Sequence, residues 1–218
     1  MKWASESGFD VPECRLVPFE RIVGLEKLIQ PDQMAFAIKR YDRSRTGRVH
    51  QEDFAQVLNL PPSKKYDSRL EEILVITRAL AGESEAMEVW RRFFFTLVSG
   101  NFDAHLKNWS FIYPDRKGAK LSPLYDQVAV VEYPEIDREL ALKFCGTRTY
   151  QALDWNRLLS RAQSLGFSRR EIRDLGHSTL RQIMSGWNTV VDNVDDSYRS
   201  AVETHWKEVA ILEDYVTG

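Results

Sequence analysis

The segment Glu85–Ser99 constrains the fold of this chain more than any other. If it is a helix, its large apolar side chains fall on nearly every side: Met87, Val89, Trp90, Phe93, Phe94, Phe95, Leu97 and Val98. A helix that is apolar all round is stable only where other elements cover it, so we expect it inside a group of helices. The three consecutive phenylalanines are then predicted to pack in the core and not to form a ligand platform.

Helical patterns on both sides of this segment supply the cover that it requires. Apolar residues recur at three- and four-residue spacing from Asp67 to a stop near Gly82, and Ser84 is a candidate N-cap for the buried helix. The other expected signals are a helix end closed by Gly8, a helix over Trp155–Ser164 between Asp154 and Gly166, a capping box of Ser168 with Glu171, and a terminal helix over Val194–Tyr215.

Strand patterns concentrate in the first part of the chain. Val11–Pro18 and Met34–Tyr41 are predicted to pair as an antiparallel ribbon, with a loop over Gly24–Asp32 between them. A turn around Gly47 and a short helix over Gln51–Leu58 are expected next.

A second strand pair is predicted after the buried helix. Asn108–Tyr113 has the pattern of a strand, Pro114–Gly118 that of a hairpin turn, and Ala119–Leu124 that of the return strand, with Asp126 at its end. Strands at the front and helices behind indicate an α+β fold.

The composition limits which kinds of partner and which cellular compartment we expect for this protein. A net charge of −2 and a pI near 6.1 give no overall attraction to nucleic acid or to membranes. Cys14 and Cys145 have no CxxC or His-rich companion, so we expect reduced, buried thiols and neither a disulfide nor a zinc site. Because no apolar run is long enough to span a membrane and the N-terminus lacks the apolar region of a secretory signal, we expect a cytoplasmic protein without a membrane partner.

The stretch GNFDAHLKNWSFIY (100–113) places several polar side chains between the buried helix and a predicted strand. Asp103 and Asn108 stand five positions apart, and Asp126 follows downstream. An acid, an amide and a second acid are the groups that hold Mg²⁺ and orient a hydroxyl in phosphoryl transfer.

A solvated turn is the simpler interpretation of a polar loop after a helix. The flanking apolar segments hold this loop next to the core, however, and turn chemistry does not require His105 or Lys107 there. Lys107 can neutralise a transferring phosphate, and His105 can hydrogen-bond to the loop or to phosphate. His177 and His205 have no partners at metal-ligand spacing, so we expect both to be structural or surface residues.

Several ordered motifs resemble the HipA family of bacterial serine/threonine kinase toxins. GNFDAHLKN is similar to the family's catalytic loop, and IKRYDR (38–43) is similar to its hinge. HQEDF with LNLPPSKKYD resembles its QED and Pro-Pro stretch, LSPLYDQVAV resembles its metal-aspartate strand, and LALKFCGTRTY begins a part similar to its C-terminal lobe. The resemblance implies a protein-kinase-like fold, with partial N-lobe strands and hinge in residues 1–42 and a mainly helical C-terminal lobe in residues 43–218.

The resemblance also implies a role for each matching residue. Asp103 would be the general base, and Asn108 and Asp126 would bind Mg²⁺. The expected ATP contacts are Lys39, Arg40 and Tyr41 at the hinge, His105 and Lys107 at the phosphates, and Asn108, Tyr125 and Asp126 as further cofactor-binding residues. Without the family, IKRYDR would be interpreted as a plain sheet strand with a Lys/Arg face, and Gln51–Asp53 could equally be a helix N-terminus favoured by the macrodipole.

The match departs from the family at the glycine-rich loop and its strand lysine, which are not found before Gly8. A separate chain that supplies this half, a shortened gene and a fragment are three open explanations. Two functions are therefore expected as alternatives: an active kinase or its catalytic lobe, and a catalytically inactive kinase-like module that binds an antitoxin or regulatory partner. A two-metal hydrolase that uses Asp103, His105 and Asp126 is disfavoured because too few further ligands are present.

Partners are also expected from the resemblance. The implied protein substrate is an aminoacyl-tRNA synthetase or a translation factor, and the implied inhibitor is a small helix-turn-helix antitoxin. DNA would be reached only indirectly, through that antitoxin. An open strand edge in Val11–Tyr41 could receive a separate N-terminal subdomain chain.

Overall fold

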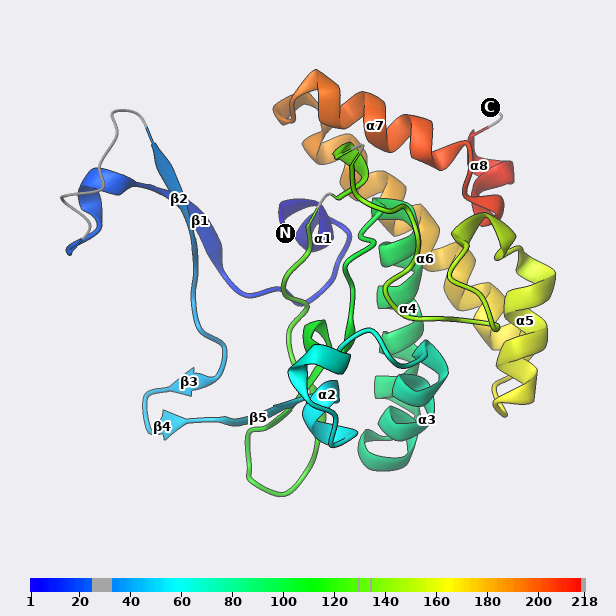
Figure 1. Ribbon diagram of the computed structural model, residues 1–218, viewed down its shortest axis with the longest axis horizontal. Helices are drawn as coiled ribbons and strands as arrows, with labels where there is room; N and C mark the ends of the chain where they lie inside the picture. Colours follow the sequence, from blue (N-terminus) through cyan, green and yellow to red (C-terminus); the bar gives the residue numbers. More distant parts are fainter. Residues whose placement is uncertain (25–32, 129, 134, 217–218) are drawn as a thin grey trace.

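The buried helix stands at the centre of a helical body in the computed structural model, which describes residues 1–24, 33–128, 130–133 and 135–216 (Figure 1). This helix is α4 (Glu83–Ser99), and it packs between α3 (Leu70–Ala81) and α6 (Arg169–Val190). α5 (Trp155–Ser164) lies against α6, α7 (Asp196–Trp206) contacts α4, and α8 (Glu213–Val216) ends the described chain.

The core is built around α4, as the sequence predicts. Trp90 and Phe94 are fully buried, and Phe93 and Phe95 are nearly so, which confirms them as core residues. The helix begins directly after Gly82, whose φ of 94° lies outside the helical region, so the predicted cap at Ser84 is wrong by two positions. Gly82 both ends α3 and opens α4, which leaves no room for a separate cap.

The caps of the later helices are confirmed. Asp154 accepts a hydrogen bond from the Arg157 amide at 2.7 Å, and Ser168 accepts one from the Glu171 amide at 3.3 Å. Gly166 follows α5 with a positive φ of 82°. No helix in the described ranges is both long and apolar enough to cross a membrane.

The predicted terminal helix over Val194–Tyr215 is wrong. α7 ends at Trp206, a 3₁₀ turn follows at Ala210–Leu212, and only then does α8 begin. Val202 and His205 on α7 and Val209, Ile211 and Leu212 after it are all buried. Val202, His205, Val209 and Leu212 would share one face of a continuous helix, but Ile211 would lie on the other side, and the bend after Trp206 allows Ile211 to be buried with them.

The opening helix is confirmed as α1 (Lys2–Glu6), closed before Gly8, which has a φ of 78°. Its Trp3 packs against Trp187 of α6, with ring centroids 4.7 Å apart, and donates its indole N–H to the Ile183 carbonyl at 2.9 Å. The short helix is therefore held by tertiary contacts with α6 and not by its own length.

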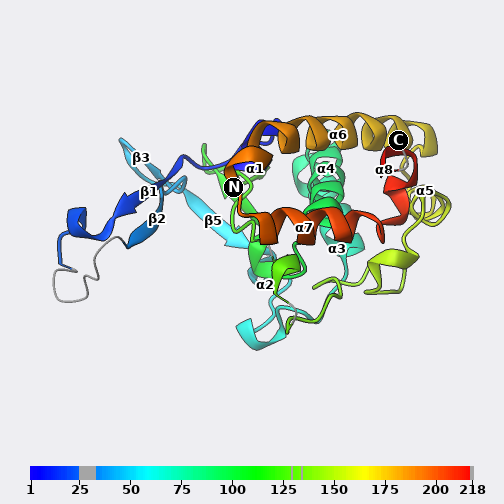
Figure 2. The ribbon, with the colours of Figure 1, turned by 90° about the horizontal axis from the view of Figure 1, so that it is seen from above.

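The predicted ribbon is confirmed as β1 (Cys14–Pro18) paired antiparallel with β2 (Met34–Ile38). Figures 1 and 2 both show it projecting from the helical body. β2 ends at Ile38 and not at Tyr41, and the ribbon pairing goes one bond further, from the Lys39 amide to the Glu13 carbonyl at 2.8 Å. Of the loop predicted over Gly24–Asp32, residues 25–32 lie outside the described residues.

The turn at Gly47 is confirmed between the two-residue strands β3 (Arg43–Ser44) and β4 (Gly47–Arg48). The helix predicted over Gln51–Leu58 is wrong in its first half, because β5 (His50–Asp53) is a strand that pairs with β6 (Ser110–Tyr113). Asp53 ends that strand and caps the short helix α2 (Phe54–Val57), so the helix-N-terminus interpretation holds for Asp53 alone.

The predicted return strand is much shorter than expected. β7 comprises only Lys120–Leu121, and the Ser122 amide makes one more bond, to the Ser110 carbonyl at 2.9 Å. Pro123 has no amide hydrogen to continue the ladder. Asp126 consequently lies beyond the strand on irregular backbone with a positive φ of 54°, and not at the strand's end as predicted.

Candidate active site

The polar loop leaves α4 at a left-handed turn. Gly100 has φ 64° and ψ 33°, and a Cβ placed there would lie 2.7 Å from the Val131 Cβ. Glycine therefore serves both the turn and the close approach of residues 130–132. Leu106–Asn108 then forms a 3₁₀ turn that leads into β6.

Two of the predicted metal ligands meet in this structure. The Asn108 side-chain amide donates a hydrogen bond to Oδ2 of Asp126, although the residues are far apart in the sequence. The Asn108 Oδ1 is buried and has no hydrogen-bond partner among the described residues. An amide oxygen without a partner beside a carboxylate is a pair of oxygen ligands that could hold a cation.

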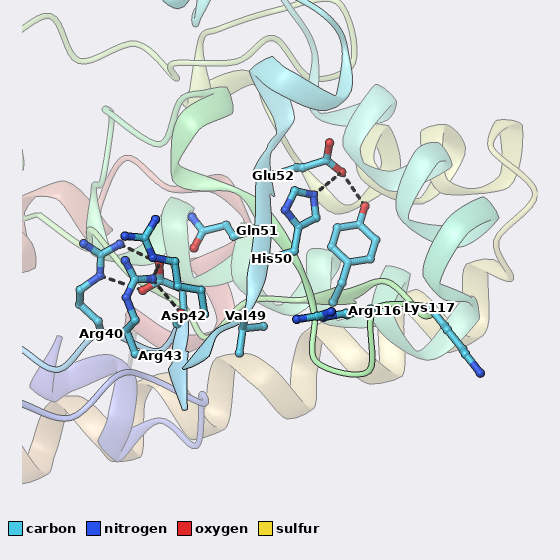
Figure 3. A pocket seen from close by; sticks show the side chains of 11 residues that line it. Arg40, Asp42, Arg43, Val49, His50, Gln51, Glu52, Arg116 and Lys117 are labelled. Carbon is cyan, nitrogen blue, oxygen red and sulfur yellow. Dashed lines mark hydrogen bonds and ion pairs between the residues drawn. The ribbon is translucent and has the colours of Figure 1, made fainter. Parts of the chain in front are cut away.

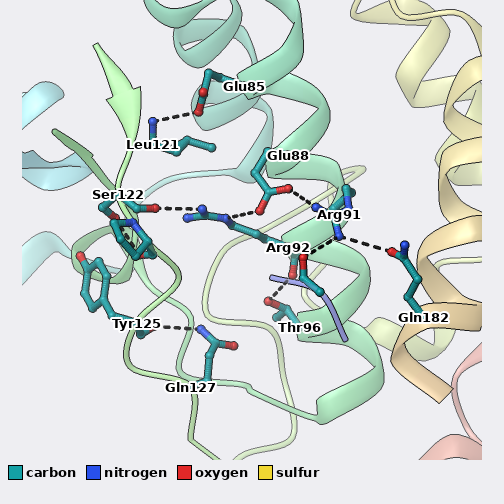
Figure 4. Close-up of polar contacts among 12 residues, drawn as sticks. Glu85, Glu88, Arg91, Arg92, Thr96, Leu121, Ser122, Tyr125, Gln127 and Gln182 are labelled. Atoms are coloured by element: carbon teal, nitrogen blue, oxygen red, sulfur yellow. Dashed lines mark hydrogen bonds and ion pairs between the residues drawn. The ribbon is translucent and has the colours of Figure 1, made fainter. Parts of the chain in front are cut away.

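Side chains of α4 hold the backbone at Leu121 and Ser122, shortly before Asp126 in the sequence, as Figure 4 shows for these contacts. The Arg92 guanidinium donates to the Ser122 carbonyl at 2.8 Å and pairs with Glu88 at 2.9 Å, and the Leu121 amide donates to Glu85 at 2.9 Å. The irregular segment after β7 is thereby held by side chains of a buried helix. These contacts take the place of the strand pairing that is absent after β7, and they keep Asp126 opposite Asn108.

Tyr125 connects this segment to the loop. Its hydroxyl donates to the Lys107 carbonyl at 2.6 Å and lies 2.6 Å from the Ser110 hydroxyl. Burial raises the pKa of the Tyr125 phenol, so the hydroxyl stays a hydrogen-bond donor. Its ring also lies 5.6 Å from that of Tyr41, centroid to centroid, so two predicted nucleotide contacts come together.

Asp103 has a partner that sequence reasoning missed. The Tyr66 hydroxyl donates to Oδ1 of Asp103 at 2.7 Å. Burial, followed by this contact with the Asp103 carboxylate, raises the pKa of the Tyr66 phenol to about 12. The only sequence signal was the place of Tyr66 in the Pro-Pro stretch, which carries no indication of what its side chain touches.

His105 lies between the two carboxylate-bearing segments. Burial lowers the pKa of its imidazole, and this outweighs the opposite effect of the Asp103 and Asp126 carboxylates. Its Nδ1 is buried and has no partner among the described residues. A neutral imidazole with an uncommitted nitrogen suits a contact with a bound ligand such as a phosphate.

Lys107 is engaged elsewhere in this structure. Its ammonium lies 2.8 Å from the Asp53 carboxylate, which also caps α2 by accepting from the Gln56 amide at 2.9 Å. The pair joins the loop to the end of β5, and the spacing of the two residues in the sequence gave no sign of it. The phosphate contact predicted for Lys107 requires it to leave Asp53.

Two of the three predicted hinge residues, Lys39 and Arg40, form charge pairs at the surface, and Figure 3 shows the pairing of Arg40 with Asp42. Arg40 and Arg43 both bind the Asp42 carboxylate, and the Arg40 hydrogen bonds in particular lower the pKa of that carboxyl to about 2. Lys39 pairs with Glu13 at 3.1 Å, and both side chains are exposed. Among the described residues, the ring of Tyr41 connects the hinge to the loop side through Tyr125.

The residues present fit a magnesium ion that is bound chiefly by its nucleotide. Within the described ranges, no three His, Cys, Asp or Glu side chains gather in a group able to hold a metal. Mg²⁺ prefers oxygen ligands and commonly takes one or two from the protein, with phosphates and water as the rest. Asn108 Oδ1 and the Asp126 carboxylate are a set of that kind. A metal site built from protein ligands alone, as a two-metal hydrolase needs, does not fit them.

Known proteins with similar sequences were found over most of the chain. The model of the family described as HipA-like C-terminal domain matches residues 1–187. The putative kinase Y4dM of Sinorhizobium fredii is 35% identical over 221 residues, covering 99% of this chain and 54% of the relative. The serine/threonine-protein kinase toxin HipA of Shewanella oneidensis is 28% identical over 166 residues, covering 65% of this chain and 35% of the relative.

A solved structure shares the fold. The complex of HipA, HipB and operator DNA from Shewanella oneidensis MR-1 contains a chain that matches with a TM-score of 0.77 and 21% identity, over 100% of this chain and 56% of that one. The predicted α+β, kinase-like fold is thus confirmed. The chain spans about half the length of the curated relatives that it matches.

Proposed function

Because this chain belongs to the HipA-like C-terminal domain family, we propose that it is a serine/threonine kinase or the catalytic lobe of one. It would transfer the γ-phosphoryl group of ATP to a protein hydroxyl. The observation that supports this most strongly is the contact of Asn108 with Asp126, because Asn108 lies on the same polar loop as Asp103. Phosphoryl transfer depends mainly on positioning and charge, so few residues are needed if they are well placed.

Asp103 is the proposed general base. Its Oδ1 accepts from Tyr66, so Oδ2 can take the proton of the acceptor hydroxyl as the oxygen–phosphorus bond forms and ADP leaves. Asp103 also lines a cavity of about 370 Å³, whose walls include the apolar Phe102, Val130 and Leu140. This cavity is the proposed place for the side chain that carries the hydroxyl.

Asn108 and Asp126 are the proposed ligands of Mg²⁺, and His105 is a proposed phosphate contact. Bound Mg²⁺ would neutralise charge on the phosphates. Tyr41 and Tyr125 would contact the nucleotide from the hinge side, where their rings already lie together. Lys107 then serves chiefly to fix the loop to Asp53.

Transfer of label from [γ-³²P]ATP tests this proposal. The purified chain is incubated with Mg²⁺ and a degenerate serine/threonine peptide library, and label is measured on the peptides and on the chain itself. Asp103→Asn should lower transfer by about 10²-fold or more, because the base is lost while the shape is kept.

Asp174→Asn is the matched control, because it makes the same change at an exposed carboxylate on α6 that does not line the cavity. It should transfer label at nearly the rate of the unchanged chain. An Asp103→Asn variant as active as the unchanged chain would contradict the assignment of the base.

One observation favours a second function, as a module that binds a partner without turnover. On the outer face of the ribbon, Leu16 stands opposite Phe36, with exposed fractions of 63% and 53%. A two-stranded ribbon is rarely stable alone, and an exposed apolar face favours a protein that covers it. Candidates are a helix-turn-helix antitoxin, such as the HipB in the similar complex, and an N-terminal subdomain.

A further inference from the structure

The segment before α3 makes three contacts with the polar loop, and Tyr66 is at its centre. The Tyr66 hydroxyl donates to Oδ1 of Asp103 at 2.7 Å. Its ring meets that of His105 edge to face, with centroids 5.2 Å apart. The neighbouring Lys65 carbonyl accepts from the Leu106 amide at 3.1 Å, so the backbone is joined to the loop as well.

Tyr66 is itself held from the opposite side. The Arg148 guanidinium donates to the Tyr66 carbonyl at 2.8 Å, which ties this residue to the segment that precedes α5. Tyr66, Asp103 and Arg148 all line the cavity next to the proposed base. The hydroxyl of Tyr66 therefore approaches Asp103 from a backbone fixed at two points.

We infer that Tyr66 is a positioning residue for Asp103, which fixes the rotation of the carboxylate so that Oδ2 faces the acceptor hydroxyl. A carboxylate without such a donor can rotate about its last bond, and a misplaced base reduces the rate of the step that it assists. This inference rests on the proposed function, since it assigns Tyr66 a part in the same reaction.

Tyr66→Phe tests the inference, because it removes the hydroxyl and keeps the ring that packs on His105. We expect kcat for label transfer to fall roughly 10- to 100-fold while KM for ATP stays unchanged. The split between kcat and KM separates a positioning role from general loosening, which would affect both.

Tyr113→Phe is the matched control. The Tyr113 hydroxyl donates to the Glu52 carboxylate at 2.8 Å, and burial followed by this contact raises the pKa of its phenol to about 12, as at Tyr66. This variant loses the same kind of hydrogen bond away from Asp103, so its kcat should equal that of the unchanged chain. A Tyr66→Phe variant with the same kcat as the control would overturn the inference.

A readout without turnover separates this inference from the proposed function. Ring-carbon NMR of ¹³C-labelled tyrosine follows the Tyr66 phenol, whose pKa of about 12 should fall in Asp103→Asn. Equal values in both chains would overturn the inference even if transfer is observed. A chain that shows this coupling but transfers no label would overturn the proposed function and, with it, the catalytic use of Tyr66.

Discussion

At the scale of single residues, His205 shows how burial sets a response to pH. It is fully buried on α7, its Nε2 lies 2.7 Å from the Leu97 carbonyl, and burial lowers the pKa of its imidazole. The unfolded chain takes up this proton near pH 6.5, while the folded chain resists it. The contribution of His205 to stability is therefore complete above about pH 6.5 and declines as the pH falls below that value.

Urea unfolding at pH 8, 7, 6 and 5 measures this effect. The free energy of unfolding should fall less steeply on the acid side in His205→Gln than in the unchanged chain, because one titrating group is removed. His50→Gln is the control, since His50 is exposed at the surface. Identical acid-side slopes in the unchanged chain and His205→Gln would contradict the account.

Sequence reasoning at this scale found the residues whose order is informative and missed those that act through contact. Asp103, Asn108 and Asp126 stand out by type and order along the chain, and the folded chain brings Asn108 and Asp126 into contact. Tyr66 and Asp53 could not be assigned, because their roles depend on pairings with Asp103 and Lys107 that only the folded chain creates.

At the scale of elements, the junction of α4 with the loop depends on Gly100. In Gly100→Ala, the alanine would have to adopt a positive φ, which is unfavourable for a residue with a side chain. Its Cβ would also lie 2.7 Å from the Cβ of Val131. We expect a loss of about 1–3 kcal/mol in the free energy of unfolding, measured by urea denaturation.

Gly118→Ala is the control for this substitution, because its nearest neighbours would be the Asp115 carboxylate oxygens at 3.9 and 4.0 Å. It should change the free energy of unfolding by much less. Equal losses in the two variants would show that the close approach of Gly100 to Val131 does not matter.

The elements that were predicted correctly are those specified by local signals. Asp154, Ser168 and Gly166 mark helix ends with their own side chains or backbone. The errors at Gln51–Leu58 and Val194–Tyr215 have a different origin, since pairing with β6 and burial after Trp206 decided those conformations. Tertiary contacts overrode local preference in both cases.

At the scale of the whole molecule, a helical body carries the candidate site and a ribbon projects from it (Figure 2). α4 joins the two halves of the site, because the loop leaves its C-terminal end while its Glu85 and Arg92 hold the segment before Asp126. The α+β class followed from the sequence, but this support of an irregular segment by α4 did not. The division into residues 1–42 and 43–218 stays a prediction.

Calorimetry of ATP binding to the purified chain, with and without Mg²⁺, tests the central claim most directly. The claim is that Asn108 and Asp126 hold a metal-bound nucleotide next to Asp103. We predict micromolar ATP binding that requires Mg²⁺ and is lost in Asp126→Ala, whereas Asp174→Asn, at an exposed position of α6, binds as the unchanged chain does. No binding in the presence of Mg²⁺, or binding that Asp126→Ala leaves intact, would contradict the claim.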